Sequence, residues 1–296
     1  MNALDYVQFV LAPQVLNGLT LGIAVILVAL GLTIIFGLLD VINMSHGEFY
    51  AIGAYAAMAL AAANIDFWFL IALVPLLMLP LGALVERVLI RKVFDTGDRH
   101  VTTLLVTFGL GLIVEDVLKA IFGPNTLRPS TPIPGASEIF GVLIPNYRLF
   151  LILFGALIIS AVAYVVYRTR LGTMVRAAAF DRNMAASLGV PVSLVYAGTF
   201  AFGVALAGLS GVLLAPIYSV FPTMGRDFIL LAFTVVIVGG MGSIWGAVVA
   251  GLLLTQVQAL ASLVISPVWT DPIVFGTMVG FLVFRPQGIF RRLGHA

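Results

Sequence analysis

Five polar residues able to carry acid–base chemistry or hydrogen bonding stand close together near the N-terminus. They are Asp40, Asn43, Ser45, His46 and Glu48, and long apolar stretches precede and follow them. A carboxylate at the centre of a bilayer costs roughly 2.5–3.5 kcal/mol on insertion scales, so it normally faces a cavity or a partner helix. The segment is therefore a candidate for contact with a polar solute.

The residue types in this segment favour a break between two helices. Asn43 and Ser45 are of types that cap helix N-termini. Gly47 allows a sharp backbone path, and Glu48 suits the positive N-terminal end of a following helix. Two interpretations remain open. Either residues 43–48 (Asn43, Ser45, His46, Gly47 and Glu48 among them) line a translocation pathway, or the segment is a turn at the membrane surface.

A second candidate segment is rich in glycine and lies in the C-terminal half. Gly239, Gly240 and Gly242 occur together and are followed by Ser243, inside the uncharged run 228–270. Each glycine in a helix interior costs about 1 kcal/mol relative to alanine, so a helix break is predicted. One break in each half is typical of two repeats that enclose a midplane pathway, to which we assign these four residues. A tight hairpin between two crossings is the alternative.

A third segment, residues 168–191, is basic and rich in helix-forming residues. Its composition predicts a short helix over residues 173–188, which Gly189 and Pro191 end. Residues at three- and four-residue steps would give it a small-residue face for docking on a soluble partner. The candidate coupling residues are Arg176, Ala177, Ala178, Asp181, Arg182, Ala185 and Leu188. A basic helix lying on lipid phosphates is the alternative.

Membrane-spanning helices must position these segments. The 296 residues are 61% hydrophobic and 9% charged, whereas a soluble protein carries about 25% charged residues. Because a bilayer offers no water to the backbone, apolar runs of this length form helices. We predict an all-α fold, a polytopic bundle of about eight or nine spans with discontinuous helices. Residues 1–296 would form one transmembrane domain, in which residues 49–63 and 228–238 are short enough for half-helices.

The basic residues orient the chain. Most of the fifteen Lys and Arg fall within residues 87–99, 168–182 and 285–292, which the positive-inside bias places in the cytoplasm. The loop 123–148 and the N-terminal flank then lie outside. An N-terminus outside and a C-terminus inside require an odd number of full crossings.

Four motifs occur in a fixed order along the chain. They are INMSHGE at 42–48 with IGAY at 52–55, TRLG at 169–172 with RAAAFD at 176–181 and ASLG at 186–189, GGMGSIWG at 239–246, and RPQG at 285–288. By these motifs the chain resembles the permease subunits of high-affinity branched-chain amino acid importers driven by ATP-binding cassettes. That family also includes urea and amide permeases. Ser45 stands where the family more often has alanine.

The resemblance implies a multi-pass permease of the cell inner membrane that imports branched-chain or related amino acids, with urea or amides as the alternative. It also implies a second related permease, two cytoplasmic ATPase subunits and an extracytoplasmic solute-binding protein as partners, besides membrane lipid. Lys92 and Lys119 are the lysines of the chain, and neither stands in a glycine-rich P-loop. We therefore expect no ATP-binding site, enzyme activity, cofactor, metal site or nucleic-acid partner.

Two other classes of function compete with a permease. An intramembrane enzyme would use His46 and Glu48, but the chain has 3 His and no HExxH motif to complete a metal site. An ion-coupled transporter or channel needs intramembrane proton or cation carriers. The candidates for that role are Asp40, Glu48, Glu115 and Asp116.

Overall fold

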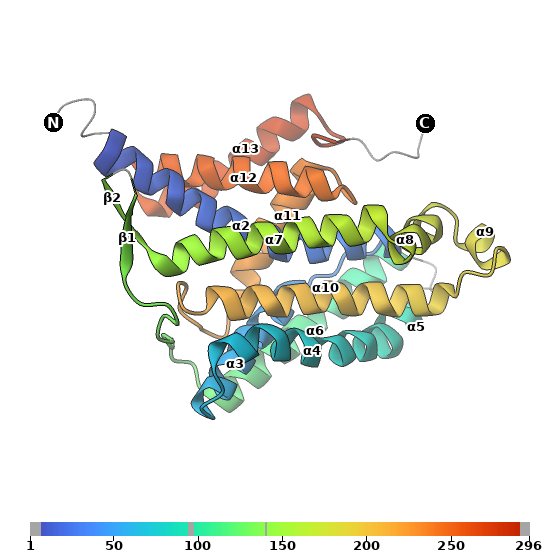
Figure 1. The fold of residues 1–296 in the computed structure, drawn as a ribbon. Coiled ribbons are helices and arrows are strands. Elements are labelled where there is room, and N and C mark those ends of the chain that lie inside the picture. The colour runs from blue at the N-terminus through green and yellow to red at the C-terminus, as the bar shows by residue number, and fades with distance from the viewer. Residues whose placement is uncertain (1–6, 94–97, 140, 291–296) are drawn as a thin grey trace.

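The computed structural model describes residues 7–93, 98–139 and 141–290, most of them in helices (Figure 1). In chain order the elements are η1 (Val7–Leu11), α2 (Ala12–Leu39), α3 (His46–Ala62), α4 (Phe67–Val85), η2 (Glu86–Ile90), α5 (Arg91–Val93), α6 (Arg99–Phe122), β1 (Ala136–Ile139), β2 (Val142–Pro145), α7 (Asn146–Arg168), α8 (Arg170–Phe180), α9 (Arg182–Ser187), α10 (Val192–Leu214), α11 (Met224–Gly239), α12 (Ile244–Ala261), η3 (Pro267–Trp269) and α13 (Thr270–Phe284).

In the described ranges, 6 helical segments are long and apolar enough to cross a bilayer. They are Gln8–Leu39, Phe67–Val93, His100–Phe122, Asn146–Arg168, Val192–Leu214 and Ile244–Ala261. The helices α3, α11 and α13 have 17, 16 and 15 residues, fewer than the roughly 20 of a full crossing. The predicted all-α, polytopic membrane fold is confirmed, and the count of eight or nine spans stays a prediction.

The loop before α7 contains a β-hairpin that the sequence analysis did not predict. Its strands β1 and β2 pair antiparallel, with Ala136 opposite Pro145. Asn146, the first residue of α7, fixes the base of the hairpin: its side chain donates to Pro134 O (3.2 Å) and accepts from Ser137 Oγ (2.6 Å). The Pro and Ser residues of this loop indicate irregular structure. Its two short strands are stabilised only by pairing with each other.

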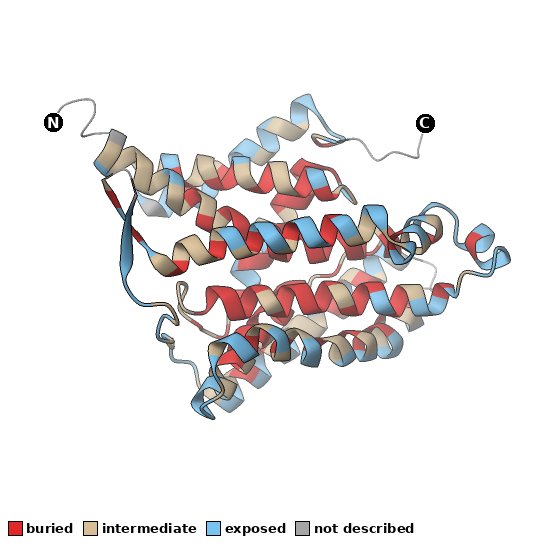
Figure 2. Cartoon of the chain, viewed as in Figure 1, coloured by how far each residue is buried: buried red, intermediate tan, exposed pale blue. Residues whose placement is uncertain are grey.

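The centre of the bundle is formed by α2 and α10. The most apolar stretch of α2 is 89% buried and that of α10 is 83% buried, whereas the corresponding stretches of α4, α6 and α7 are each 28% buried (Figure 2). The two central helices meet at glycines: a Cβ added to Gly31 would lie 2.6 Å from Gly203 O. Because neither residue has a side chain, the backbones approach closely.

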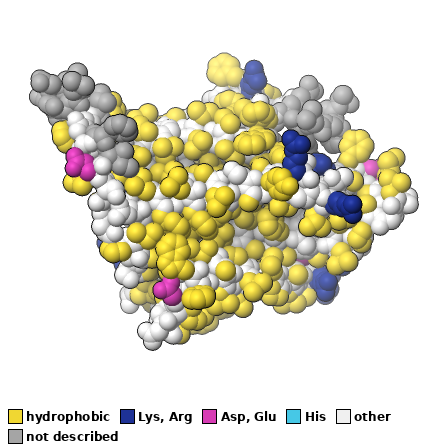
Figure 3. Space-filling model, viewed as in Figure 1, with side chains coloured by type: hydrophobic (Ala, Val, Ile, Leu, Met, Phe, Trp, Pro, Cys, Tyr) yellow, Lys and Arg dark blue, Asp and Glu magenta, His cyan; other side chains and the backbone are white. Residues whose placement is uncertain are grey.

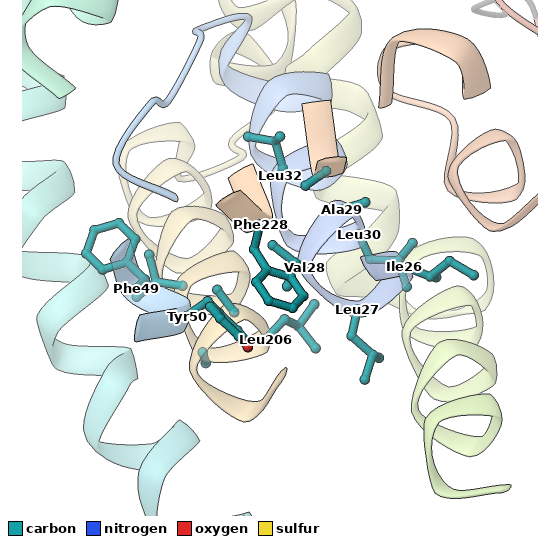
Figure 4. Close-up of a cluster of buried hydrophobic side chains, with 14 of the residues drawn as sticks. Ile26, Leu27, Val28, Ala29, Leu30, Leu32, Phe49, Tyr50, Leu206 and Phe228 are labelled. Atoms are coloured by element: carbon teal, nitrogen blue, oxygen red, sulfur yellow. The ribbon is translucent and has the colours of Figure 1, made fainter. Parts of the chain in front are cut away.

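Short helices complete the core around this contact. Tyr50 of α3 and Phe228 of α11 stack with ring centroids 4.3 Å apart, next to Val28 of α2 and Leu206 of α10 (Figure 4). Aromatic pairs of this kind contribute about 0.5–1.5 kcal/mol beyond their buried area. The starts of α3 and α11 are thereby held together inside the bundle.

Each central helix belongs to a group of three helices, and the two groups are inverted relative to each other. In the first group α4 packs on α10 and α3 also packs on α10, whereas in the second α12 and α11 pack on α2. The two central helices run in opposite directions, since α2 begins where Arg148 donates to Asn17 and α10 ends where Tyr147 Oη donates to Leu213 O. These are the contacts of two inverted repeats, α2–α4 and α10–α12.

The bundle has two chemically distinct ends. The hairpin end carries β1, β2 and the starts of α2 and α7 (Figure 1). The basic end carries α5, α8, α9 and the start of α10, where Arg91 donates to Ser193 O (3.0 Å), and most of the visible Lys and Arg side chains gather there (Figure 3). Two of the predicted cytoplasmic segments, 87–99 and 168–182, thus share one end. Arg291 and Arg292 of the third lie outside the described residues.

Candidate functional site

The first predicted segment packs against the middle of the two central helices. Its His46 has 0% exposure, and Nε2 lies 3.1 Å from Val28 O in α2. Because a carbonyl oxygen can only accept, Nε2 carries the proton in this contact. The ring also lies beside Gly31, which faces Gly203, the central residue of α10. The helix break is therefore at the depth of the helix middles, and its role in a pathway stays a prediction.

The segment that leads to α3 is held by its own polar groups and by α6. Asn43 Oδ1 accepts from Ser45 Oγ (2.7 Å) and Ser45 N (3.2 Å), so Ser45 stands at the N-cap position of α3 without capping it through its side chain. Met44 N donates to Thr107 Oγ1 of α6 (3.0 Å). Among the described atoms, Asn43 Nδ2 and His46 Nδ1 are buried without a partner. A buried polar atom without a hydrogen-bond partner costs about 1–3 kcal/mol of stability, so these two atoms favour water or a solute beside them.

Charged residues from α3, α6 and α11 meet around the start of α11. Glu115 is 5% exposed and accepts from Lys119 (2.5 Å) and Arg226 (2.6 Å). The carboxyl group of Glu48, also 5% exposed, packs on Gly225, where an added Cβ would lie 2.6 Å from its carboxyl carbon. Glu48 Oε2 has no hydrogen-bond partner in the part of the chain that the structure describes.

Only part of this charged group is predictable from the sequence. Glu48 is a predicted pathway residue and Glu115 a predicted ion carrier, but neither is connected by the sequence with Lys119 or Arg226. One signal was present, because Arg226 and Asp227 alone separate the uncharged runs 183–225 and 228–270. Charge at a single point of a long apolar run marks a functional position in a membrane protein.

The glycine-rich break pairs with the end of the described chain. Gly240 has φ 100°, and a Cβ on Gly288 would lie 2.6 Å from Gly240. Phe290 N donates to Gly239 O (3.2 Å). Ser243 caps α12, since its Oγ accepts from Gly246 N (3.1 Å). The helix breaks as predicted, and the neighbours found for Gly239 and Gly240 are other backbone segments of the chain.

The two breaks lie at different places in the bundle. Gly225, which contacts Glu48, and Gly239 are at opposite ends of α11, about 21 Å apart at 1.5 Å per residue. Gly242 instead lies 3.1 Å from the Cβ position of Gly37, near the end of α2. The contacts given above for the described residues do not join residues 45–48 with residues 239–243. That the two breaks approach each other along a shared pathway stays a prediction.

The predicted coupling helix is two helices. Asp181 has an extended backbone (φ −149°, ψ 110°), and its carboxylate accepts from Asn183 N (2.8 Å) and Met184 N (2.9 Å). It therefore caps α9, whereas the single helix predicted over residues 173–188 was wrong. Asp favours N-caps over helix interiors because its short side chain competes for backbone N–H groups.

An open hollow of about 330 Å³ lies between α8 and α9 at the basic end. Its lining residues are Thr173, Arg176, Ala177, Phe180, Asp181, Met184, Ala185 and Leu188. Phe180 and Leu188 are 72% and 78% exposed, whereas Ala178 and Ala185, predicted to face a partner, are 3% and 2% exposed. Large apolar side chains thus form the exposed surface. Arg182 is turned toward the chain, with its guanidinium 5.6 Å from the centre of the Tyr196 ring.

Comparisons with known proteins agree with the motifs. The family described as branched-chain amino acid transport system permease component matches residues 14–283. The high-affinity branched-chain amino acid transport system permease protein BraD of Pseudomonas aeruginosa is 33% identical over 303 residues, which cover 94% of this chain and 95% of that protein.

Two relatives from Escherichia coli K12 carry similar names. The permease protein LivH is 32% identical over 294 residues, covering 94% of this chain and 95% of LivH. The permease protein LivM is 28% identical over 298 residues, covering 91% of this chain and 68% of LivM. No solved structure matches the chain significantly. The family match, which spans nearly the whole sequence, shows that this chain belongs to the permease components of branched-chain amino acid transport systems.

Proposed function

We propose that this chain is the membrane-spanning permease subunit of an ATP-binding-cassette importer that carries branched-chain or related amino acids across the cell inner membrane. The carrying observation is the family match over residues 14–283. The relatives at 33% and 32% identity are permeases for branched-chain amino acids by name, which supports this solute class over urea, amides or ions. The chain itself is a transport subunit and not an enzyme.

The proposed path of the chain has nine passes. Six are the long helices and one is α13, whereas the remaining two combine an irregular segment with α3 or α11. This count puts the N-terminus outside, the hairpin outside, and the basic end in the cytoplasm, as the positive-inside bias requires. Irregular backbone at such depth is tolerated only inside protein or beside a water-filled cavity. The polar segment 43–48 would line that cavity.

The partners follow from the family and from the basic end. LivH and LivM of one organism both match this chain, which supports pairing with a second, related permease. We assign two cytoplasmic ATPase subunits to the hollow between α8 and α9, and an extracytoplasmic solute-binding protein to the hairpin end. Membrane lipid covers the apolar sides. Nucleic acid and cofactors have no part in this function.

The contacts of α8 offer a route for coupling. This helix packs on both central helices, α2 and α10, and Arg176 at its centre donates to Val166 O at the end of α7. A displacement of α8 by closing ATPase subunits would therefore be carried to the centre of the bundle as a rigid-body movement. ATP hydrolysis in the partners would open and close the polar segment in this way.

Reconstitution tests the proposal. The chain is co-expressed with its permease partner, ATPase and binding protein, purified in mild detergent and placed in liposomes. Uptake of radiolabelled leucine should require internal ATP, and excess valine should compete whereas urea should not. Uptake by the chain alone, driven by an ion gradient, would contradict the proposal.

A further inference from the structure

The charged group around Arg226 is exposed where the helix surface is otherwise apolar. On α6, the side chains of Asp116 and Lys119 are 82% and 40% exposed, and that of Arg226 on α11 is 55% exposed. On the same helix, Ile113 lies three residues before Asp116 and Ile121 two residues after Lys119, and they are 62% and 68% exposed. The charged group thus lies in the apolar surface of a helix long enough to span a bilayer. Ionised groups in such a surface face water or protein, because lipid solvates them poorly.

Within this group, the carboxylate of Glu48 and the guanidinium of Arg226 do not use their full hydrogen-bonding capacity. Glu115 is satisfied by Lys119 and Arg226 together. Glu48, whose carboxyl packs on Gly225, keeps an unpaired and buried carboxylate oxygen. Within the described residues the guanidinium of Arg226 donates one hydrogen bond, to Glu115, although a guanidinium carries five donors.

This arrangement complements a zwitterion. An ammonium group carries three donors, of which an unpaired carboxylate oxygen can accept one, and a guanidinium binds a carboxylate through two parallel hydrogen bonds. Glu48 and Arg226 are near each other in the fold, because the Glu48 carboxyl packs on Gly225, the residue before Arg226. A solute with a positive and a negative group on neighbouring atoms would satisfy both at once, and a simple ion would satisfy one.

We infer that Glu48 and Arg226 form a transient binding site for the α-ammonium and α-carboxylate groups of an amino acid in a water-filled part of the pathway. In this site Glu48 accepts from the ammonium group, Arg226 binds the carboxylate, and Glu115 positions Arg226. The site recognises the two charged groups that all α-amino acids share, and it does not distinguish their side chains. The inference rests on the proposed function and names the residues that meet the solute inside the membrane.

Cysteine labelling tests the water-filled surface. The chain has no Cys, so Asp116→Cys gives a single reporter beside the proposed site, on a residue to which the site assigns no role. The control is Leu153→Cys, because Leu153 is 73% exposed on the peripheral helix α7. In the complete transporter in liposomes, a membrane-impermeant methanethiosulfonate should modify position 116 at least tenfold faster than position 153, since lipid excludes the reagent. Equal, slow modification would overturn the inference, because it would mean that lipid or protein, and not water, covers this face.

Protection identifies the ligand class. Leucine should slow the modification of position 116, whereas 4-methylpentanoate, which lacks the ammonium group, and 3-methylbutylamine, which lacks the carboxylate, should not. Equal protection by all three compounds, or by none, would contradict a site for zwitterions. Leucine uptake by the unmodified transporter, measured in parallel, reports on the proposed function independently.

Charge substitutions separate recognition from a structural ion pair. Arg226→Gln should lower leucine uptake roughly tenfold or more, the loss expected for charge-assisted hydrogen bonds, and Arg226→Lys should retain more of it. The double variant Glu115→Arg with Arg226→Glu keeps an ion pair between α6 and α11 and reverses the charge beside Glu48. It should remain inactive while still assembling with the ATPase. Restored uptake in the exchanged variant would show that the pair only holds the two helices together.

Discussion

At the scale of single residues, glycines mark the places where backbones of different helices touch. Gly47 in the first turn of α3 packs on Gly225 O and Ile229 of α11. Gly276 in α13 is the opposite case, because a Cβ there would have no atom of another residue within 4 Å. These two positions allow a matched comparison of the same substitution in the same secondary structure.

Gly47→Ala should destabilise the protein because the methyl group would overlap with the start of α11. We expect a loss of about 1–3 kcal/mol of unfolding free energy from overpacking, and a transport rate that falls with it. Gly276→Ala should be neutral or stabilising by up to about 1 kcal/mol, since alanine is the better helix former. Thermal unfolding in detergent, followed by size-exclusion chromatography, measures both variants. Equal melting temperatures would show that the close approach at Gly47 contributes nothing.

His46 fills the space between α2 and α10 and should act first through packing. His46→Ala would leave a cavity beside Gly31 and remove the bond to Val28 O, at a cost of roughly 2–4 kcal/mol. His100 is the control, because its side chain is 56% exposed and lies 3.8 Å from Asp40, so His100→Ala should cost less than about 1 kcal/mol. If His46→Ala melts like the parent protein and yet fails to transport, the ring has a role beyond packing.

Residue types along the sequence revealed the polar segment and not its partners. Asn43 to Glu48 stand out because polar residues are costly in an apolar run. The ion pair of Glu115 with Arg226 joins positions 111 residues apart, and nothing local in the sequence indicates such a contact. Likewise, the glycine content near Gly240 predicted a break but not its partner, since Gly288 approaches only once the chain is folded.

At the scale of elements, the helices α8 and α9 at the basic end show why a surface segment is harder to predict than a buried one. The helix-forming residues over 173–188 predicted helix correctly except at Asp181, whose capping bonds divide it. Periodicity also placed Ala178 and Ala185 on one face, and the structure places that face inward. The exposed surface includes Leu188, which the sequence analysis named, and also Phe180 and Met184, which the pattern did not indicate.

Leu188→Asp should weaken the proposed contact with the ATPase. The side chain is 78% exposed at the rim of the hollow, so a carboxylate there leaves the fold intact and places an unpaired charge in an apolar interface. We expect at least about tenfold weaker ATPase association and a parallel loss of uptake. The control is Val264→Asp, because Val264 is 87% exposed in the connection between α12 and α13, away from the hollow.

Co-purification of the ATPase with each variant, quantified against the amount of permease, gives the measurement. If both variants retain the ATPase equally well, α8 and α9 are not its docking surface. If Leu188→Asp retains the ATPase but loses uptake, the segment transmits movement without providing the binding energy.

At the scale of the whole molecule, hydropathy predicted a membrane bundle but not how its halves interlock. Long apolar runs are enough to indicate the spanning helices. The inverted packing of α4 on α10 and of α12 on α2 surrounds the Gly31–Gly203 contact between the central helices. The sequences of the two halves diverge so far that no repeat is visible, and only the contacts reveal it.

The proposed topology can be tested because the chain has no Cys and each reporter is therefore unambiguous. Nine passes place Asn125, in the loop before the hairpin, outside, and Ser187, at the end of α9, in the cytoplasm. Asn64, in the turn between α3 and α4, tests whether the irregular segment and α3 form one pass. If the irregular segment and α3 together cross the membrane, position 64 is outside.

Single variants Asn64→Cys, Asn125→Cys and Ser187→Cys are treated with a membrane-impermeant maleimide before and after permeabilisation of the cells. Positions 64 and 125 should react in intact cells, and position 187 only after permeabilisation, because the charged reagent does not cross hydrocarbon. Reaction of position 64 only after permeabilisation would place the start of α4 inside. The basic residues at the end of α4 would then lie outside, against the positive-inside bias. That result would remove the pass through α3, and with it the reason for a polar segment at the centre of the membrane.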